Sequence, residues 1–256
     1  MNELIFLGTC SGTEPMVGMH QTSIVLNIND TIYYLDAGEN CGYASYTMGL
    51  DPMKTRAVFI SHTHIDHIGG FPHLLFLIDK IAWRDKTSLG ENNNLDVYIP
   101  SSEIFAAIKT VGESDGAPLR FSVTEHGISD GELYRDDNIK IRALHNRHLG
   151  EDGSNGWHSF SFLIEAAGKR ILYSGDIKEL TEIDPLLEGG CDILIMESGH
   201  HKVSAILDYV ATRKVGTLFF SHHGREIINN RAAMQKLVCE HKQNAYIASD
   251  GLRVEL

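Results

Sequence analysis

Histidine and aspartate side chains are concentrated in one short stretch, residues 62–67. It runs His-Thr-His-Ile-Asp-His and so carries three imidazoles and one carboxylate, groups that bind transition metals well. His62 and His64 are two apart on a segment expected to be extended, so both side chains should face one way. Asp66 and His67 follow beyond a bend and are available to a second ion. This spacing predicts a metal site; the alternative is a polar loop that is rich in histidine by chance.

The flanking segments predict how this stretch is positioned. Residues 56–61 are apolar and indicate a short buried strand, whereas residues 71–83 have the pattern of a helix with an apolar face. Residues 62–67 should therefore lie on a loop between a strand and a helix, where a rigid scaffold presents side chains to a ligand.

Four predicted strands in the second half are each followed by residues that bind metal, carry protons or hold anions. The strands are residues 138–144, 170–174, 192–196 and 216–221. The residues that follow them are His145 and His148, Asp176, Glu197 with His200 and His201, and His222 with Arg225. A lone Gly-Asp is a common turn, so Asp176 gains weight only from the strand before it and from residues 62–67.

The pattern His-x-His-x-Asp-His resembles the metallo-β-lactamase superfamily. A glycine-rich loop at residues 8–12 and the Asp-x-Gly-Glu of residues 36–39 are similar to its tRNase Z branch and the phosphodiesterase relatives of that branch. The resemblance implies an α/β fold, the αββα metallo-β-lactamase sandwich, in which two mixed sheets are flanked by helices. It also implies a single domain over residues 1–256, with pseudo-halves of about 1–130 and 131–256.

The resemblance also implies two divalent metal ions that bridge a hydroxide, with zinc expected and manganese or iron as alternatives. The first ion would be held by His62, His64 and His148, the second by Asp66, His67 and His222, and Asp176 would bridge them. His148 is preferred to His145 because it lies seven residues after Ile141, the family spacing. Asp36 would orient a metal-bound histidine, or would instead be an Asx-type turn residue.

The predicted catalytic residues are Asp66, Glu197, His200 and Arg225. Glu197 and His200 would form a general-acid dyad, with His201 as the alternative acid, and Arg225 would hold a phosphate oxygen. The predicted function is a phosphodiesterase of ribonuclease Z type that acts on RNA ends or on small cyclic or organic phosphodiesters. The alternatives are a carbonyl hydrolase (lactonase, thioesterase or lactamase) and a metal-binding protein without turnover.

Composition limits the partners. The net charge of −12 disfavours polyanions, and we find no long basic insertion of the kind with which tRNase Z enzymes grip tRNA, so tight binding of long nucleic acid is not expected. The sequence contains no run of 18 apolar residues, so no membrane span is predicted. Four widely spaced cysteines predict reduced thiols and a cytoplasmic location. Relatives are commonly dimers, so a homodimer is one expectation.

Overall fold

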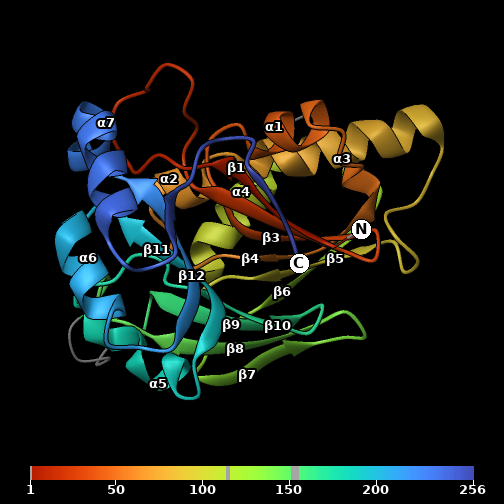
Figure 1. The fold of residues 1–256 in the computed structure, drawn as a ribbon. Coiled ribbons are helices and arrows are strands. Elements are labelled where there is room, and N and C mark those ends of the chain that lie inside the picture. Colours follow the sequence, from red (N-terminus) through yellow and green to blue (C-terminus); the bar gives the residue numbers. More distant parts are fainter. Residues whose placement is uncertain (1, 114–115, 151–155) are drawn as a thin grey trace. The chain divides into compact units, whose positions relative to one another are not determined.

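The computed structural model describes residues 2–113, 116–150 and 156–256 (Figure 1). The chain forms two compact units. Unit 1 comprises Met1–Gly8, Glu14–Gly127 and Asp250–Leu256, and unit 2 comprises Thr9–Thr13 and Ile128–Ser249. Each unit contains one seven-stranded sheet that is partly parallel and partly antiparallel, with helices packed against it.

The sheet of unit 1 has the strand order β14-β1-β2-β3-β4-β5-β6. Its strands are β1 (Glu3–Gly8), β2 (Ser23–Ile28), β3 (Thr31–Ala37), β4 (Thr55–Phe59), β5 (Asn94–Tyr98), β6 (Ser122–His126) and β14 (Arg253–Glu255). Pairing is antiparallel from β14 to β3 and parallel from β3 to β6. Parallel neighbours need long crossovers, and the one from β4 to β5 carries residues 62–67.

Helices of unit 1 cover its sheet with an apolar layer. They are α1 (Cys41–Thr47), the 3-10 helix η1 (Pro52–Lys54), α2 (Ile65–Ile68), α3 (Phe71–Asp85) and α4 (Ser102–Gly112). The apolar face predicted for the helix of residues 71–83 consists of Phe71, Leu74, Leu75, Phe76 and Ile78. In α3, Phe71, Leu74, Leu75 and Ile78 are fully buried, as predicted. Phe76, also predicted as core, is only partly buried, because two residues turn the helix by roughly 200° away from Leu74.

The sheet of unit 2 has the strand order β13-β12-β11-β10-β9-β8-β7. Its strands are β7 (Gly131–Arg135), β8 (Ile139–His145), β9 (Phe160–Ala166), β10 (Lys169–Tyr173), β11 (Cys191–Ser198), β12 (Val215–His223) and β13 (Ala245–Ile247). Pairing is antiparallel from β7 to β10 and parallel from β10 to β13. All residues of β11 except Asp192 are buried, as expected for a parallel strand covered on both faces.

Helices of unit 2 pack on the parallel half of its sheet. They are the 3-10 helix η2 (Leu180–Ile183), α5 (Asp184–Leu187), α6 (Val203–Val210) and α7 (Arg225–Glu240). The amphipathic pattern of residues 203–213 predicts a helix over that range, but α6 ends at Val210. Arg213 instead folds back, where its Nη1 donates to the carbonyl of Tyr209 at 2.7 Å and its guanidinium pairs with Asp184. In the described part of the chain, no helix has the length and apolar character needed to cross a membrane.

The sequence of residues 245–255 predicts one edge strand, and the structure differs from this prediction. The segment forms two strands in different sheets: β13 pairs with β12 in unit 2, and β14 pairs with β1 in unit 1. A turn with Gly251 at φ +84° separates them, and Gly251 N donates to the carbonyl of Phe6 at 2.8 Å. Both short segments have the alternating pattern of strands, but nothing local in the sequence encodes the change of sheet.

Candidate metal centre

Unit 1 holds its donor residues at the carboxyl end of β4 and on α2. His62, Asp66 and His67 are buried, whereas His64 is exposed. His62 Nε2 lies 3.0 Å from His64 Nδ1, so the two rings face one way, as two residues on extended backbone should. His67 Nε2 lies 3.5 Å from a carboxylate oxygen of Asp66, and these two residues, predicted to lie in a loop beyond a bend, lie on the short helix α2. Unit 1 therefore offers two adjacent pairs of donors.

Asp36 orients His67, the role that the resemblance implied. Its Oδ2 lies 2.7 Å from His67 Nδ1, and its Oδ1 accepts from the backbone N–H of Ser61 at 2.6 Å. A carboxylate only accepts, so Nδ1 of His67 carries the proton and Nε2 keeps a lone pair. This tautomer is the one that a metal ligand needs.

Gly38, in the Asp-x-Gly-Glu motif, allows the close approach of these segments. A Cβ atom at this position would lie 2.3 Å from the backbone oxygen of Asp66. Because backbone atoms cannot yield as a flexible side chain does, glycine is required where the end of β3 meets α2.

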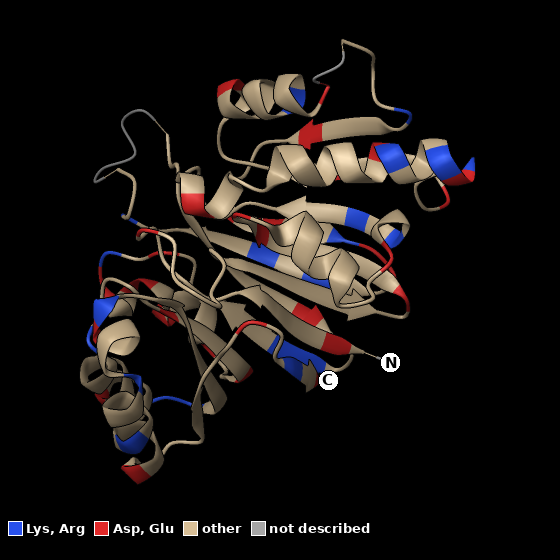
Figure 2. Cartoon of the chain, turned by 90° about the horizontal axis from the view of Figure 1, so that it is seen from above, with Lys and Arg blue, Asp and Glu red and all other residues tan. Residues whose placement is uncertain are grey.

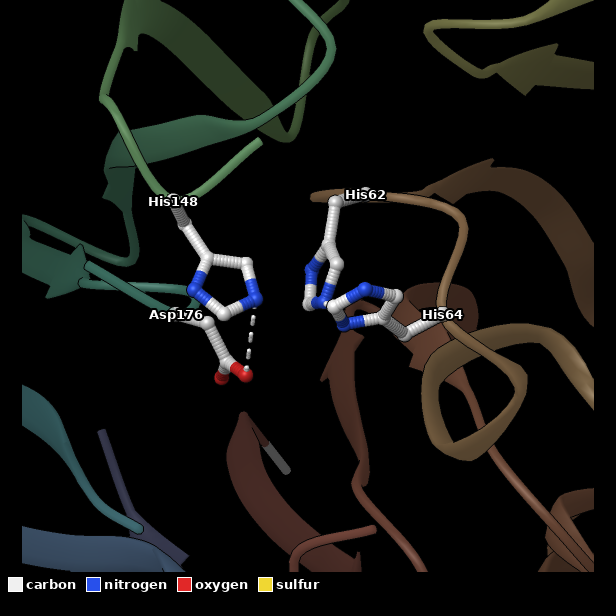
Figure 3. Close-up of side chains that lie close together, drawn as sticks. All are labelled: His62, His64, His148 and Asp176. Atoms are coloured by element: carbon white, nitrogen blue, oxygen red, sulfur yellow. Dashed lines mark hydrogen bonds and ion pairs between the residues drawn. The ribbon is translucent and has the colours of Figure 1, made fainter. Parts of the chain in front are cut away.

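Unit 2 gathers its donor residues around Asp176. One carboxylate oxygen of Asp176 lies 3.7 Å from His148 Nε2, 3.8 Å from His200 Nδ1 and 3.3 Å from His222 Nε2. Asp176, Glu197 and His222 follow or end the adjacent parallel strands β10, β11 and β12, whose carboxyl ends meet at one edge of the sheet. Figure 3 shows His148 beside Asp176 from unit 2, and His62 with His64 from the loop after β4 in unit 1.

Glu197 holds His200. Its Oε2 accepts from the backbone N–H groups of Gly199 and His200 at 2.8 and 2.9 Å, and its Oε1 lies 3.2 Å from His200 Nδ1. Burial alone would raise the pKa of Glu197, but the hydrogen bond with His200 and the nearby His222 outweigh it and hold this pKa well below its usual range. The hydrogen bond with Glu197 in turn raises the pKa of His200, with burial opposing.

The structure distinguishes His200 from His201. The His200 side chain is 43% exposed and its Nδ1 is held by Glu197, which leaves Nε2 for a substrate. The His201 side chain is 14% exposed, and its Nε2 donates to the carbonyl of Ile177 at 3.1 Å. Asp176, His200 and His222 also bring donor atoms within 4.8 Å of one another, so His200 is placed to bind metal as well, a role that sequence reasoning missed.

His145 and His148 have different surroundings. His145 Nδ1 donates to Asp130 at 2.7 Å, and its ring stacks on Trp157 at 3.9 Å between centroids. His148 faces Asp176, and its backbone N–H donates to Asn146 Oδ1 at 3.2 Å. These contacts favour His148 as the donor, although the assignment stays a prediction. Residues 151–155 of the loop predicted to contact substrate lie outside the described residues.

A buried network of hydroxyl and amide groups supports the His148 loop and was not anticipated. Asn146 accepts from Ser159 Oγ at 2.6 Å and donates to Ser161 Oγ at 3.2 Å. Ser161 donates to the carbonyl of Ser174, and Ser174 Oγ accepts from the backbone N–H of Glu197 at 3.0 Å. The only signal in the sequence was a pair of serines two residues apart, Ser159 just before β9 and Ser161 within it, and such residues usually indicate only an edge or a solvated face.

Arg225 is the first residue of α7 and is exposed. A cation in the first turn of a helix opposes the helix dipole, at a cost of about 0.3–1 kcal/mol. The role of Arg225 in binding an anion stays a prediction.

His223, next to His222, is a buried hydrogen-bonded residue. It contacts the carbonyl of Ala248 at 2.9 Å and Ser198 Oγ at 3.1 Å. Burial lowers the pKa of His223 to about 4, Arg231 and His222 act in the same direction, and the Ala248 carbonyl opposes them. The sequence places His223 directly after the predicted ligand His222 and predicts a surface or hydrogen-bonded histidine, not a ligand.

We expect His223 to make the protein sensitive to acid. In the unfolded chain a histidine has a pKa of about 6.5, so between pH 6.5 and 4 the unfolded state binds the extra proton and stability falls as pH falls. Between pH 7 and 5 the loss should be about 2 kcal/mol. Urea unfolding of wild type and His223→Gln at both pH values measures it. The variant should have a lower free energy of unfolding at pH 7, but this free energy should fall less than that of wild type between pH 7 and 5. Equal falls in the two proteins would contradict the assignment.

Solved structures identify the class. The metallo-β-lactamase fold protein YhfI from Bacillus subtilis superposes with a TM-score of 0.75 at 18% identity and covers 100% of both chains. Human tRNase Z, short form, superposes with a TM-score of 0.71 at 18% identity, over 99% of this chain and 98% of that one. The chain has the metallo-β-lactamase fold, so the predicted fold class is confirmed.

A family model and curated relatives also match the chain. The model of the anti-Pycsar protein Apyc1 family matches residues 2–204, which is most of the chain. The chain belongs to this family. Ribonuclease Z of Methanothermobacter thermautotrophicus is 31% identical over 150 residues, 58% of this chain and 45% of the relative. Ribonuclease Z of Listeria monocytogenes is 29% identical over 171 residues, 66% of this chain and 50% of the relative. The chain thus spans about half the length of the curated relatives it matches.

Proposed function

We propose that the donors of the two units bind the same two divalent metal ions. His62, His64 and His148 would hold the first ion, Asp66, His67 and His222 the second, and Asp176 both. Support comes from the superfamily order of the seven residues, the tautomer that Asp36 sets on His67, and the grouping of His148 and His222 around Asp176. Three imidazoles suit zinc, and the carboxylates also accept manganese or iron.

The bound ions would supply a nucleophile from water at neutral pH and neutralise charge on a phosphoryl oxygen. The remaining roles belong to side chains of this chain. Nε2 of His200 would donate a proton to the leaving oxygen, while Glu197 keeps the ring oriented and protonated. Arg225 would hold a non-bridging phosphate oxygen through its guanidinium.

The reaction that we propose is hydrolysis of a phosphodiester, in a small cyclic or organic molecule or at an RNA end. The contact between Glu197 and His200 carries this proposal, because an alkoxide leaving group needs a proton. The ester of a lactone or thioester and the amide of a lactam can be opened in this superfamily without such a dyad. A carbonyl hydrolase of the same fold is the second candidate, and a metal-binding protein without turnover is the third.

A panel of three substrates tests the proposal on metal-loaded protein. Bis-p-nitrophenyl phosphate, a lactone and a thioester should be assayed side by side, followed by a cyclic mononucleotide as an alkyl phosphodiester. We expect turnover of the phosphodiesters alone. Faster turnover of the lactone or thioester would favour the second candidate, and no turnover of any substrate by protein that holds two equivalents of metal would favour the third.

We expect no tight complex with precursor tRNA. Attraction between basic side chains and phosphates supplies most affinity for nucleic acid, and this chain has a net charge of −12. Asp and Glu are spread over elements of both units (Figure 2). Binding of labelled precursor tRNA at about physiological salt should be weaker than micromolar. A nanomolar complex would contradict this prediction and favour an RNA-end substrate.

We further propose that hydrolysis serves the anti-Pycsar role after which the family is named. In cells that carry a Pycsar system, the wild-type chain should counteract it and the Asp176→Ala variant should not. Equal effects of both would indicate sequestration without turnover. Cytoplasmic location and a homodimeric assembly remain predictions, and light scattering of the purified protein tests the second.

A further inference from the structure

A cavity in unit 2 lies at the amino-terminal ends of the parallel strands β10, β11 and β12, away from their carboxyl ends, where Asp176 lies. It has a volume of about 420 Å³ and is lined where β10, β11 and β12 begin. Strand β11 begins at Cys191 and ends at Ser198. At about 3.3 Å per residue, the two ends of the parallel strands are therefore roughly 20 Å apart. A ligand in this cavity would not touch the proposed metal centre directly.

Cationic side chains dominate the lining of this cavity. They are Arg170, Arg213 and Lys214, and Asp192 is the one carboxylate among the lining residues. Arg213 is neutralised by Asp184, whose two oxygens accept from Nε and Nη2 at 2.8 and 3.1 Å. In a chain with a net charge of −12, such a cluster reverses the sign of the charge locally.

The positive charges of Arg170 and Lys214 are not neutralised. Within the described residues neither side chain forms an ion pair with a carboxylate. Nε of Arg170 is buried without a hydrogen-bond partner, so a ligand would be contacted by the Nη groups. Nη2 of Arg170 donates to the backbone carbonyl of Glu188 at 3.2 Å, which fixes the guanidinium without neutralising it. Asp192 accepts from the backbone N–H of Arg170, not from its guanidinium.

Gly189 leaves room for this guanidinium. Its φ of +85° disfavours other residues, and a Cβ atom there would lie 2.8 Å from Arg170 Nη1. The turn before β11 thus brings the backbone close to the charged group without covering it.

We propose that this cavity binds a phosphate group, carried by inorganic phosphate or by a phosphomonoester. The guanidinium of Arg170 can donate to a phosphate oxygen through Nη1 while Nη2 stays bound to the Glu188 carbonyl, and Lys214 adds a point charge. A volume of about 420 Å³ exceeds what a bare ion needs and falls in the range of small-molecule sites, so a phosphomonoester fits. The site is separate from the proposed hydrolysis.

Amide NMR of the metal-loaded protein tests this site locally. Inorganic phosphate and a nucleoside 5′-monophosphate should each shift the amide signals of Gly189, Gly190 and Gly216 with saturation, and chloride at equal ionic strength should not. Tighter binding of the nucleotide would identify a phosphomonoester as the ligand. Gly199 and Gly224, beside the Asp176 cluster, report separately on binding there.

Arg170→Gln and Lys214→Gln should each raise the Kd for phosphate, obtained from the shifts at Gly189 and Gly190, about tenfold. This is the effect of losing one hydrogen bond to a charged group. Lys236→Gln is the matched control, because this exposed lysine on α7 pairs with Glu240 away from the cavity. Far-ultraviolet circular dichroism and metal content check that each variant folds. Absence of saturating shifts, equal shifts with chloride, or unchanged affinity in either cavity variant would overturn the proposal.

Discussion

Asp176→Ala should lose most of the hydrolytic activity, by more than about 100-fold. Even groups that only orient a metal ligand are worth about 10- to 100-fold in metal affinity or activity, and Asp176 is placed to be a ligand itself. Its carboxylate lies within 4 Å of a ring nitrogen of His148, His200 and His222. Elemental analysis should show two equivalents of divalent metal in wild type and fewer in the variant.

The fold of this variant should persist, because Asp176 follows β10 and is not part of the apolar cluster of unit 2. Asp208→Ala is the matched control, since Asp208 is an exposed carboxylate on α6. His64→Ala and His148→Ala test whether the two units share an ion: each should lose about one equivalent, and the double variant should lose no more. Losses that add would mean separate sites, and wild type with well under one equivalent would end the metal proposal.

His200→Ala should slow hydrolysis of alkyl phosphodiesters by about 10²- to 10⁴-fold, the usual range for general acid catalysis. Hydrolysis of nitrophenyl phosphodiesters should change little, because nitrophenolate leaves without a proton. His200 is expected to be the acid because Glu197 holds its Nδ1, while the partly exposed ring leaves Nε2 free to donate a proton to the leaving oxygen. Rates on both substrates, with metal content measured in parallel, give the comparison.

His201→Ala serves as the control for His200→Ala, because His201 Nε2 is engaged by the carbonyl of Ile177. Equal losses on both substrates with normal metal content would remove the acid assignment and, with it, the main reason to prefer a phosphodiester to a carbonyl substrate. Equal losses with reduced metal content would assign His200 as a ligand, which its distance to Asp176 also allows.

The pH dependence gives an independent test of the pair. The hydrogen bond with Glu197 raises the pKa of His200, and the acid must be protonated to act. Activity on alkyl phosphodiesters should therefore fall as pH rises through this pKa. Glu197→Gln removes the carboxylate and lowers the pKa, so the falling limb should move to lower pH. A limb that does not move would show that another group controls it.

Local patterns were enough to place the donor residues on the right elements. The apolar run before His62 forms β4, and the runs before Asp176, Glu197 and His222 form β10, β11 and β12. Such runs are reliable because a strand buried on both faces needs nearly continuous apolar residues. Ser101 caps α4 by accepting from the N–H of Ile104 at 3.3 Å, in the predicted region, since a cap is also a local interaction.

Contacts between segments distant in sequence had no such signal. The sequence offered Asp36 as an orienting residue only through a resemblance, and its hydrogen bond with His67 depends on β3 and β4 being neighbours. The separation of His145, held by Asp130 and Trp157, from His148 likewise depends on packing in unit 2.

The C-terminal strands and the cavity lined by Arg170 and Lys214 also depend on contacts between distant segments that local sequence patterns do not predict. Residues 245–247 and 253–255 have similar local patterns, yet they complete different sheets because each pairs with the edge strand that the rest of the chain leaves open. Arg170 and Lys214 lie 44 positions apart on separate turns, and only the parallel alignment of β10, β11 and β12 brings both to one cavity. Periodicity and capping act over a few residues and are written in the sequence, whereas pairing and burial depend on the whole chain.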